Sequence, residues 1–269
     1  MNNMSNKKGK VYFIGGGPGD PELLTIKAKN ILEIADIVIY ADSLVHPSIV
    51  DYANPAAEVY GSKKLNLEEI TALELKAASE GKIVARVQSG DPSIYGAILE
   101  QMRILKSNDV DFEIIPGVAS AFAASALLQT ELTVPGVSQS VIFTRLEGRV
   151  PMPPREQLKD LASHGCTLLI FLSITRMTKL VGELREAGYP EDTPIAVAYK
   201  VGWEEEQVIR GDLTDIAKKV RDAKITLSAL VMVGAAFDPN ILDMENVDSS
   251  NLYSPGYTHL YRSAVANSK

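Results

Sequence analysis

Three short stretches combine glycine with residues that could hold a small ligand. Residues 15–21 read Gly-Gly-Gly-Pro-Gly-Asp-Pro, residues 89–93 read Ser-Gly-Asp-Pro-Ser, and residues 116–121 read Pro-Gly-Val-Ala-Ser-Ala. Glycine lets a backbone approach a ligand closely, and Asp91 can accept hydrogen bonds from a ligand or cap a following helix. The small side chains of the third stretch permit close packing and also leave room for a flat purine.

The first stretch resembles a dinucleotide-binding turn but lacks what a pyrophosphate needs. Gly15 and Gly17 stand where the first two glycines of that fingerprint belong, and Asp20 occupies the third position. Pro18 and Pro21 remove two backbone N–H groups, and the added carboxylate would repel a phosphate. No Gly-Lys-Ser/Thr run is present, which excludes a P-loop. The alternatives are a tight turn without a ligand and a loop shaped for a ligand without phosphate; the latter agrees better with the other two stretches.

Strand and helix patterns alternate along the chain, and each of the three stretches follows a strand pattern. In the first half we expect strands at 11–14, 37–40, 83–87 and 112–115 and helices at 23–35, 68–80, 93–106 and 119–128. Such alternation predicts a mainly parallel sheet covered by helices on both faces. Ligands bind at the carboxyl ends of strands in such sheets, so the three stretches should share one edge and form a cleft.

The pattern breaks near residues 133–136, which predicts two domains. We expect an N-terminal α/β domain over 10–133 and a C-terminal α/β domain over 137–239, each with a mostly parallel or mixed sheet between helices. Residues 240–269 are predicted to form a polar tail.

Composition and charge narrow the function classes. The net charge of −7 argues against nucleic acid as a partner, because phosphate binding needs a basic face. No apolar run approaches the roughly 18 residues of a membrane helix and the N-terminus resembles no signal peptide, so we expect no membrane partner and a cytoplasmic location. The single cysteine, Cys166, is interpreted as a buried core thiol rather than a nucleophile. His46, His164 and His259 lack metal-ligand spacing, so no metal site is predicted.

The order and spacing of the motifs resemble the tetrapyrrole (corrin/porphyrin) methyltransferase family. The resemblance rests on Gly-x-Gly-Pro-Gly-Asp-Pro at 15–21, on Tyr-Ala-Asp-Ser-Leu-Val at 40–45, on Gly90-Asp91-Pro92 and on Ile-Pro-Gly-Val at 115–118, and it covers residues 10 to 239. It implies a class III methyltransferase fold of two αβα domains, with S-adenosylmethionine folded into the cleft between them and S-adenosylhomocysteine as the product. It also implies a homodimer.

The resemblance further implies which residues line the cofactor pocket. Leu172 stands where the family typically has methionine, a replacement that a hydrophobic contact should tolerate. The implied cofactor-binding residues are Pro18, Ser89, Gly90, Asp91, Ile94, Ala119, Ser120, Leu172, Val201 and Gly234.

Other stretches are similar to one branch of the family, which methylates C-11 of precorrin-4 or cobalt-precorrin-4. They are 40–45, 95–102, 144–149, 199–200 and 253–262. Methyl transfer from a sulfonium is an in-line displacement, so the enzyme chiefly aligns donor and acceptor. Asp42 matches a position proposed as a base in related enzymes, and a turn or N-cap role is an equal alternative. The substrate carries many carboxylates, for which the candidate partners are Arg145, Arg149, Lys200 and, as a weaker candidate, Arg86.

Several other functions remain open from the sequence. Within the family, methylation of a precorrin at C-17 or C-20 is the nearest alternative. An RNA methyltransferase of the same fold predicts a basic face, against which the net charge of −7 counts. An NAD-dependent oxidoreductase is disfavoured by the broken fingerprint. A tetrapyrrole sensor or carrier without enzymatic activity would bind the ring and show no turnover with S-adenosylmethionine.

Overall fold

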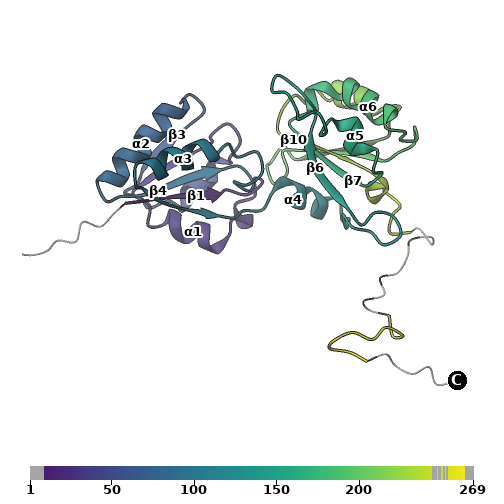
Figure 1. Cartoon of the computed structure of the whole chain (residues 1–269), viewed down its shortest axis with the longest axis horizontal. Helices are drawn as coiled ribbons and strands as arrows, with labels where there is room; N and C mark the ends of the chain where they lie inside the picture. The colour runs from purple at the N-terminus through teal and green to yellow at the C-terminus, as the bar shows by residue number, and fades with distance from the viewer. Residues whose placement is uncertain (1–8, 244–246, 248–249, 251, 253, 264–269) are drawn as a thin grey trace, which may run out of the picture. The chain divides into compact units, whose positions relative to one another are not determined.

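The computed structural model describes residues 9–243, 247, 250, 252 and 254–263 (Figure 1). The expected tail at 240–269 therefore lies partly outside the described residues. The chain divides into two compact units. The N-terminal unit comprises the residues up to Ala124 together with Lys200–Gln207, and the C-terminal unit comprises Ser125–Tyr199 and the residues from Val208 onward. The units thus divide inside a helix, and the sequence-based domains 10–133 and 137–239 stay a prediction.

The N-terminal unit is built on a parallel sheet, as the alternating pattern predicts. The strand order is β3-β2-β4-β1-β5, and every recorded pair is parallel. The strands are β1 (Lys10–Gly15), β2 (Ile37–Tyr40), β3 (Glu58–Gly61), β4 (Ile83–Gln88) and β5 (Asp111–Ile115), and the helices are α1 (Ile26–Leu32), α2 (Leu67–Ser79), α3 (Leu99–Ser107) and α4 (Ser120–Leu127), with short 3-10 helices η1 (Pro21–Leu23) and η2 (Pro47–Tyr52).

Alternating side chains of the strands direct helices to both faces of this sheet. In β1, Phe13 packs into a core with residues of α2 and α3, whereas Ile14 packs into a second core with residues of α1. This follows from the two-residue period of a strand, which sends neighbouring side chains to opposite faces. In Figure 1, α1 accordingly lies on the other side of the sheet from α2 and α3.

Local signals explain where two of these helices begin. A reciprocal capping box starts α2, because Asn66 Oδ1 accepts from the Glu69 N–H at 2.9 Å and Glu69 Oε2 accepts from the Asn66 N–H at 2.8 Å. The helix expected from residue 93 begins only at Leu99. The intervening turn holds Tyr95 and Ala97 at φ of 56° and 51°, a left-handed conformation that an α-helix of L-residues does not accommodate.

The C-terminal unit has a mixed sheet with the order β6-β7-β10-β8-β9. Strands β6 and β7 are parallel, whereas β10 runs antiparallel to both β7 and β8. The strands are β6 (Val141–Arg145), β7 (Thr167–Phe171), β8 (Ile195–Tyr199), β9 (Gln207–Gly211) and β10 (Ala229–Val233), and the helices are α5 (Leu158–Ala162), α6 (Met177–Glu186) and α7 (Ile216–Asp222), with 3-10 helices η3 (Ile174–Arg176) and η4 (Ala235–Phe237).

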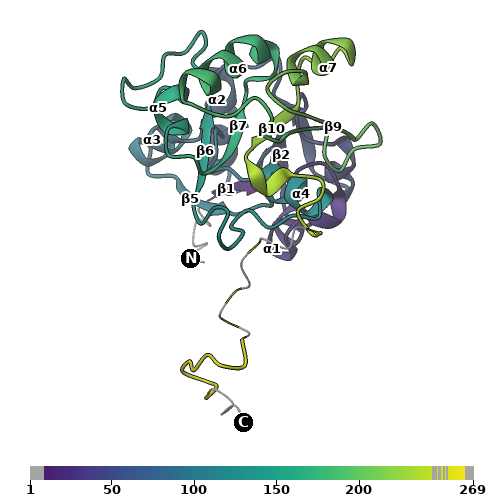
Figure 2. The same cartoon turned by 90° about the vertical axis from the view of Figure 1, so that its right-hand side faces the viewer.

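Helices α5, α6 and α7 contribute to one apolar core with the sheet (Figure 2). Leu180 and Leu184 of α6 pack there among buried residues of β7, β8 and β10. Cys166 is buried against the same core with a free thiol, which confirms its interpretation as a core residue.

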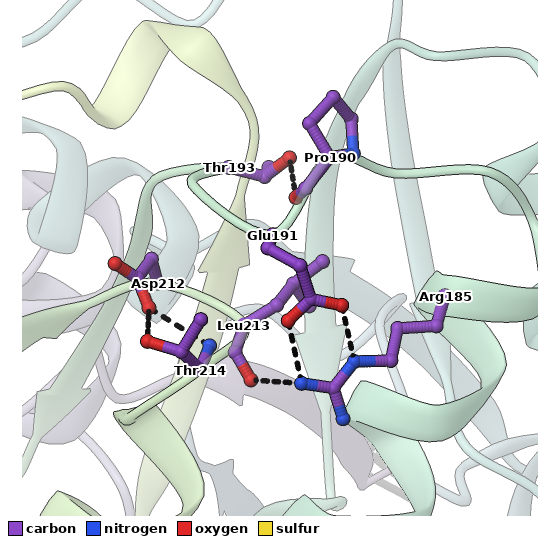
Figure 3. A network of polar contacts seen from close by, with 7 residues as sticks. All are labelled: Arg185, Pro190, Glu191, Thr193, Asp212, Leu213 and Thr214. Atoms are coloured by element: carbon purple, nitrogen blue, oxygen red, sulfur yellow. Dashed lines mark hydrogen bonds and ion pairs between the residues drawn. The ribbon is translucent and has the colours of Figure 1, made fainter.

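A polar network fastens α6 to the loops around it (Figure 3). The Arg185 guanidinium donates from Nε and Nη2 to the two Glu191 carboxylate oxygens, each at 2.7 Å, and from Nη2 to the Leu213 carbonyl at 3.0 Å. Two parallel bonds of this kind match the guanidinium fork to the carboxylate. The pair therefore orients the segment that leads into β8.

Candidate functional site

The three glycine-containing stretches meet at one edge of the parallel sheet, which confirms the prediction that they share an edge. They follow β1, β4 and β5, which are direct neighbours in the sheet. The first two are joined by an isolated antiparallel bridge, in which the Gly90 N–H donates to Gly17 O at 2.8 Å and the Gly17 N–H donates to Gly90 O at 3.3 Å. Two loops far apart in the sequence thus form one backbone surface.

Glycine is required at this surface because the backbones touch. A Cβ on Gly15 would lie 2.5 Å from the Gly117 Cα, and a Cβ on Gly117 would lie 2.2 Å from Gly90 O. Both distances are shorter than any carbon contact tolerates, and the obstructing atoms belong to the backbone. Ala119 and Ser120 lie against Gly90 at the same place, because a Cβ on Gly90 would lie 3.5 Å from the Ala119 Cα.

Asp91 connects the second stretch to the third. Its Oδ1 accepts from the Ser93 N–H at 2.8 Å and from the Ser93 hydroxyl, and its Oδ2 accepts from the Gly117 N–H at 2.9 Å. Burial opposes ionisation of this carboxyl, yet these hydrogen bonds outweigh it and lower the pKa of Asp91. Because α3 starts at Leu99, Asp91 caps no helix. It is an ionised carboxylate that orders the ligand-side loops.

The remaining implied cofactor residues of the N-terminal unit lie on these loops. Pro18 is buried in the first turn, and Ser89 and Ile94 are partly exposed on either side of Asp91. Val201 is buried in the 200–207 segment of the same unit. The structure therefore gathers the implied residues of this unit on contiguous loops.

The register of the second sheet separates two of the implied residues, Leu172 and Gly234. Leu172 follows β7 and Gly234 follows β10. Because β10 is antiparallel to β7, with Val233 opposite Leu168, Gly234 lies at the opposite edge of the sheet from Leu172. Because the two positions lie at opposite edges, we do not include Gly234 among the proposed cofactor contacts.

The residues that share the edge of Leu172 were missed by sequence reasoning. Ala229, at the start of β10, is opposite Tyr199, which places the turn at 227–229 beside the carboxyl ends of β7 and β8. Leu227 is 54% exposed, and Ser228 has a φ of 49°. No sequence signal pointed to these residues, because their exposure, their backbone angle and their place at this edge all depend on the direction of β10.

Backbone strain also gathers in the candidate loops. Leu172 combines a φ of 52° with 70% exposure, and Lys200 has a φ of 46°. Left-handed conformations of residues other than glycine carry strain of about 1–3 kcal/mol and concentrate at functional sites. These outliers therefore support a ligand-binding role for the loops that follow β7 and β8.

The structure corrects the role of Arg86. Its side chain is 5% exposed and lies inside the N-terminal unit, where Nε donates to Gln101 Oε1 and Nη1 donates to Ile39 O, both at 3.2 Å. Burial lowers its pKa, and the charge of Glu74 counteracts that effect. A guanidinium held there meets no substrate, so Arg86 is a structural residue.

The other candidate cations differ in how they are engaged. Arg145, at the end of β6, donates from Nη1 to Val150 O at 3.0 Å and from Nη2 to Pro151 O at 2.9 Å, and it thereby shapes the loop that carries the exposed Arg149. Lys200 pairs with Glu205 at 2.7 Å and is 19% exposed. Of the three, Arg149 is placed best to contact a carboxylate from solvent.

Asp42 is engaged on both carboxylate oxygens. Oδ2 pairs with Lys63 Nζ at 3.1 Å, and Oδ1 accepts from the Lys63 N–H at 2.7 Å. Burial opposes ionisation, but the hydrogen bonds and charge of Lys63 outweigh it and lower the pKa of Asp42. A general base works best with a pKa near the working pH, so this geometry favours the turn role over the base.

Neither a cluster of metal-ligating side chains nor a membrane-spanning helix is present among the described residues. No group of three or more histidine, cysteine, aspartate and glutamate side chains is arranged there to hold a metal ion. Within the same residues, no helix has the length and apolar character needed to cross a membrane.

The chain is similar to known proteins over most of its length. Residues 10–217 match the family model of Tetrapyrrole (Corrin/Porphyrin) Methylases. The chain is 49% identical to the cobalt-precorrin-4 C(11)-methyltransferase of Methanocaldococcus jannaschii over 96% of its length and 98% of that protein. The X-ray structure of a cobalt-precorrin-4 methyltransferase superimposes with a TM-score of 0.84 at 46% identity, covering 89% of this chain and 99% of that one.

A solved structure also contains a cofactor product. The uroporphyrin-III C-methyltransferase of Thermus thermophilus in complex with S-adenosylhomocysteine has a TM-score of 0.69 and 30% identity, and the match covers 84% of this chain and 98% of that one. The similarity thus includes relatives that act on different tetrapyrroles.

Proposed function

Because the chain belongs to the tetrapyrrole methylase family, we propose that it transfers a methyl group from S-adenosylmethionine to C-11 of precorrin-4 or cobalt-precorrin-4, in cobalamin biosynthesis. The observation that carries the proposal is the 49% identity, over nearly the full length of both chains, to a protein named for this reaction. The exposed arginine on the loop after β6 agrees with a substrate rich in carboxylates.

The residues present fit a cofactor that is positively charged and has no phosphate. S-adenosylmethionine supplies a methyl group already activated by its sulfonium, which departs as a neutral thioether. The loops offer the ionised Asp91 and small residues that leave backbone accessible, and the prolines at 18 and 21 remove donors that a phosphate would use. The loops therefore suit this cofactor better than a dinucleotide.

The chain's own residues act in this mechanism chiefly by alignment. Holding donor and acceptor in line replaces a bimolecular encounter with a step inside one complex. The Gly17–Gly90 bridge and the Asp91–Gly117 bond hold the cofactor loops rigid before the ligand arrives. We assign cofactor contacts to Pro18, Ser89, Gly90, Asp91, Ile94, Ala119, Ser120, Leu172 and Val201, and substrate contact to Arg149, with Arg145 and Lys200 in positioning roles.

The proposal extends to the assembly and location of the protein. A homodimer in the cytoplasm, with no nucleic-acid or membrane partner, agrees with the family resemblance and with the net charge of −7. Domains at 10–133 and 137–239 agree with the sheets, since all strands of the parallel sheet fall in the first range and all strands of the mixed sheet fall in the second.

One experiment tests the reaction directly. Cofactor binding is measured by calorimetry, and the protein is then incubated with S-adenosylmethionine and either precorrin-4 or cobalt-precorrin-4. A mass gain of one methyl group, located at C-11 by NMR, supports the proposal. Methylation at C-17 or C-20 would move the substrate to another branch, and cofactor binding with methylation of RNA alone would refute a tetrapyrrole substrate.

A further inference from the structure

The segment 200–207, which links two strands of the second sheet, belongs to the N-terminal unit. Its central residue, Trp203, donates from Nε1 to Pro18 O at 3.2 Å. Pro18 lies in the turn that the bridge at Gly17 joins to Gly90. A segment late in the sequence therefore contacts the glycine-rich turn directly.

The segment 200–207 and the glycine-rich turn pack so closely that neither side has room for a Cβ at its glycine. A Cβ on Gly19 would lie 2.3 Å from Trp203 Cδ1 and 2.7 Å from Val201 O. On the other side, a Cβ on Gly202, whose φ is +80°, would lie 2.4 Å from the Asp20 N. The indole and the turn thus fit together only because glycine occupies both surfaces.

The indole is held from other directions as well. The His46 ring meets it edge-on, with centroids 4.7 Å apart at 74°. Lys200 Nζ lies 5.1 Å from the ring centroid while it pairs with Glu205 at 2.7 Å. The backbone N–H of Trp203 donates to Lys200 O at 3.0 Å, which orders the turn that carries the indole. These contacts therefore fix the position of the indole against the turn at 17–20.

We propose that Trp203 is a positioning residue for the cofactor: it holds the turn at 17–20 in the shape that receives S-adenosylmethionine. This inference rests on the proposed function of the turn. Trp203 donates a hydrogen bond to Pro18 and packs against Gly19, while the Gly17–Gly90 bridge ties the same turn to the loop after β4. A turn fixed on both sides loses less conformational freedom when a ligand binds, and this strengthens binding.

The test measures S-adenosylhomocysteine binding by calorimetry in wild-type protein, W203F, W203A and Y189F. W203F keeps an aromatic ring on Gly19 and loses the donor to Pro18, whereas W203A loses both. Tyr189→Phe is the matched control, because it removes an aromatic hydrogen bond to a backbone carbonyl (Cys166 O, 3.3 Å) in the other unit. Circular dichroism and thermal melting verify that each variant is folded.

The expected result is graded. We expect Kd to rise about fivefold in W203F, as loss of one net hydrogen bond implies, and more than about tenfold in W203A, where the ring packing is lost too. The kcat at saturating cofactor stays within about twofold of wild type, because the methyl-transfer geometry is restored once the turn is occupied. Y189F binds like wild type.

A second readout comes from fluorescence. Trp203 is the single tryptophan of the chain, so S-adenosylhomocysteine should change the emission of the wild-type protein. Equal Kd values for wild type, W203F and W203A would overturn this inference and leave the cofactor site intact. The same would follow if Y189F weakened S-adenosylhomocysteine binding as much as the Trp203 variants do. Absence of binding by the wild type would overturn the cofactor site and the inference with it.

Discussion

Three buried or half-buried carboxyls of the N-terminal unit show how neighbouring groups decide what an acid can do. Asp91 and Asp42 have lowered pKa values, because hydrogen bonds to their carboxylates outweigh burial. Burial raises the pKa of Glu74 to about 7, and Arg86 only partly opposes this. Neither Glu74 oxygen accepts a hydrogen bond from a described residue. The two aspartates therefore hold loops while ionised, whereas Glu74 is a buried acid that favours its proton.

Glu74→Gln should flatten the pH dependence of stability. The pKa of Glu74 is about 7 in the folded protein against an ordinary value of 4.5, so the folded state holds a proton that the unfolded state has released. Stability therefore falls as the pH rises from about 4.5 to 7, by about 3 kcal/mol in all. Urea unfolding at pH 5 and pH 8 measures this loss. The exposed Glu68→Gln on the same helix is the control, and an unchanged pH dependence in E74Q would refute the burial argument.

Asp91→Asn should weaken cofactor binding through the order of the loops. An amide can still accept from Ser93, but it offers no charge to the Gly117 N–H and can present a second donor to it. Hydrogen bonds to a charged group contribute about 1.5–3 kcal/mol, so we expect Kd for S-adenosylhomocysteine to rise at least about tenfold. Calorimetry measures it. Ser93→Ala, which removes only the hydroxyl donor, should have a smaller effect, and the reverse order would contradict the assignment.

In the loop after β6, different arginines stabilise the loop and face the solvent. Arg145 holds it through the carbonyls of Val150 and Pro151, and Arg176 of η3 donates from Nη1 to Glu147 O. Held from both ends, the loop presents Arg149 to solvent. These contacts hold the loop in shape when no ligand is bound.

Arg149→Gln should therefore raise the KM for the tetrapyrrole about tenfold, since one charge-assisted carboxylate contact is lost, and leave the Kd for S-adenosylhomocysteine unchanged. Steady-state kinetics at saturating cofactor provide the KM. Arg155→Gln, an exposed arginine farther along the same connection, is the control. If both variants changed KM equally, general surface charge rather than a specific contact would explain the effect.

At the scale of the whole molecule, exposed apolar side chains remain on both units. Phe122 of α4 is 56% exposed and Leu172 is 70% exposed. Apolar side chains mark a ligand or protein contact only where they join into one surface, which the proposed homodimer would bury. In a monomer these apolar side chains would stay in contact with solvent, where they favour aggregation.

The assembly is tested by light scattering coupled to size-exclusion chromatography. A homodimer predicts a mass twice the 29.1 kDa of the chain, constant across dilution from micromolar concentration. Phe122→Ser is a variant that removes the exposed ring of α4. A wild-type mass equal to one chain would contradict the proposed dimer without affecting the cofactor site.

Much of the first sheet could be predicted from the sequence, because local patterns carry the necessary information there. Alternating strand and helix patterns imply parallel strands, and parallel strands place all their carboxyl ends at one edge. This rule predicts that residues 15–21, 89–93 and 116–121 meet at one edge, and the adjacent strands β4, β1 and β5 place them there. The motifs likewise sufficed to identify the family, because their order and spacing extend along most of the chain.

Tertiary structure alone decided the rest, because pairing between distant segments leaves no local pattern. The antiparallel direction of β10 places Gly234 at the edge opposite Leu172 and places residues 227–229 at the same edge as Leu172. The enclosure of Arg86 by helices on one face of the sheet turned a candidate substrate cation into a core residue. The contact between Trp203 and the turn at Pro18 joins residues 185 positions apart. Local patterns thus indicated the three loops that follow β1, β4 and β5, whereas pairing between distant segments decided which side chains pack against them.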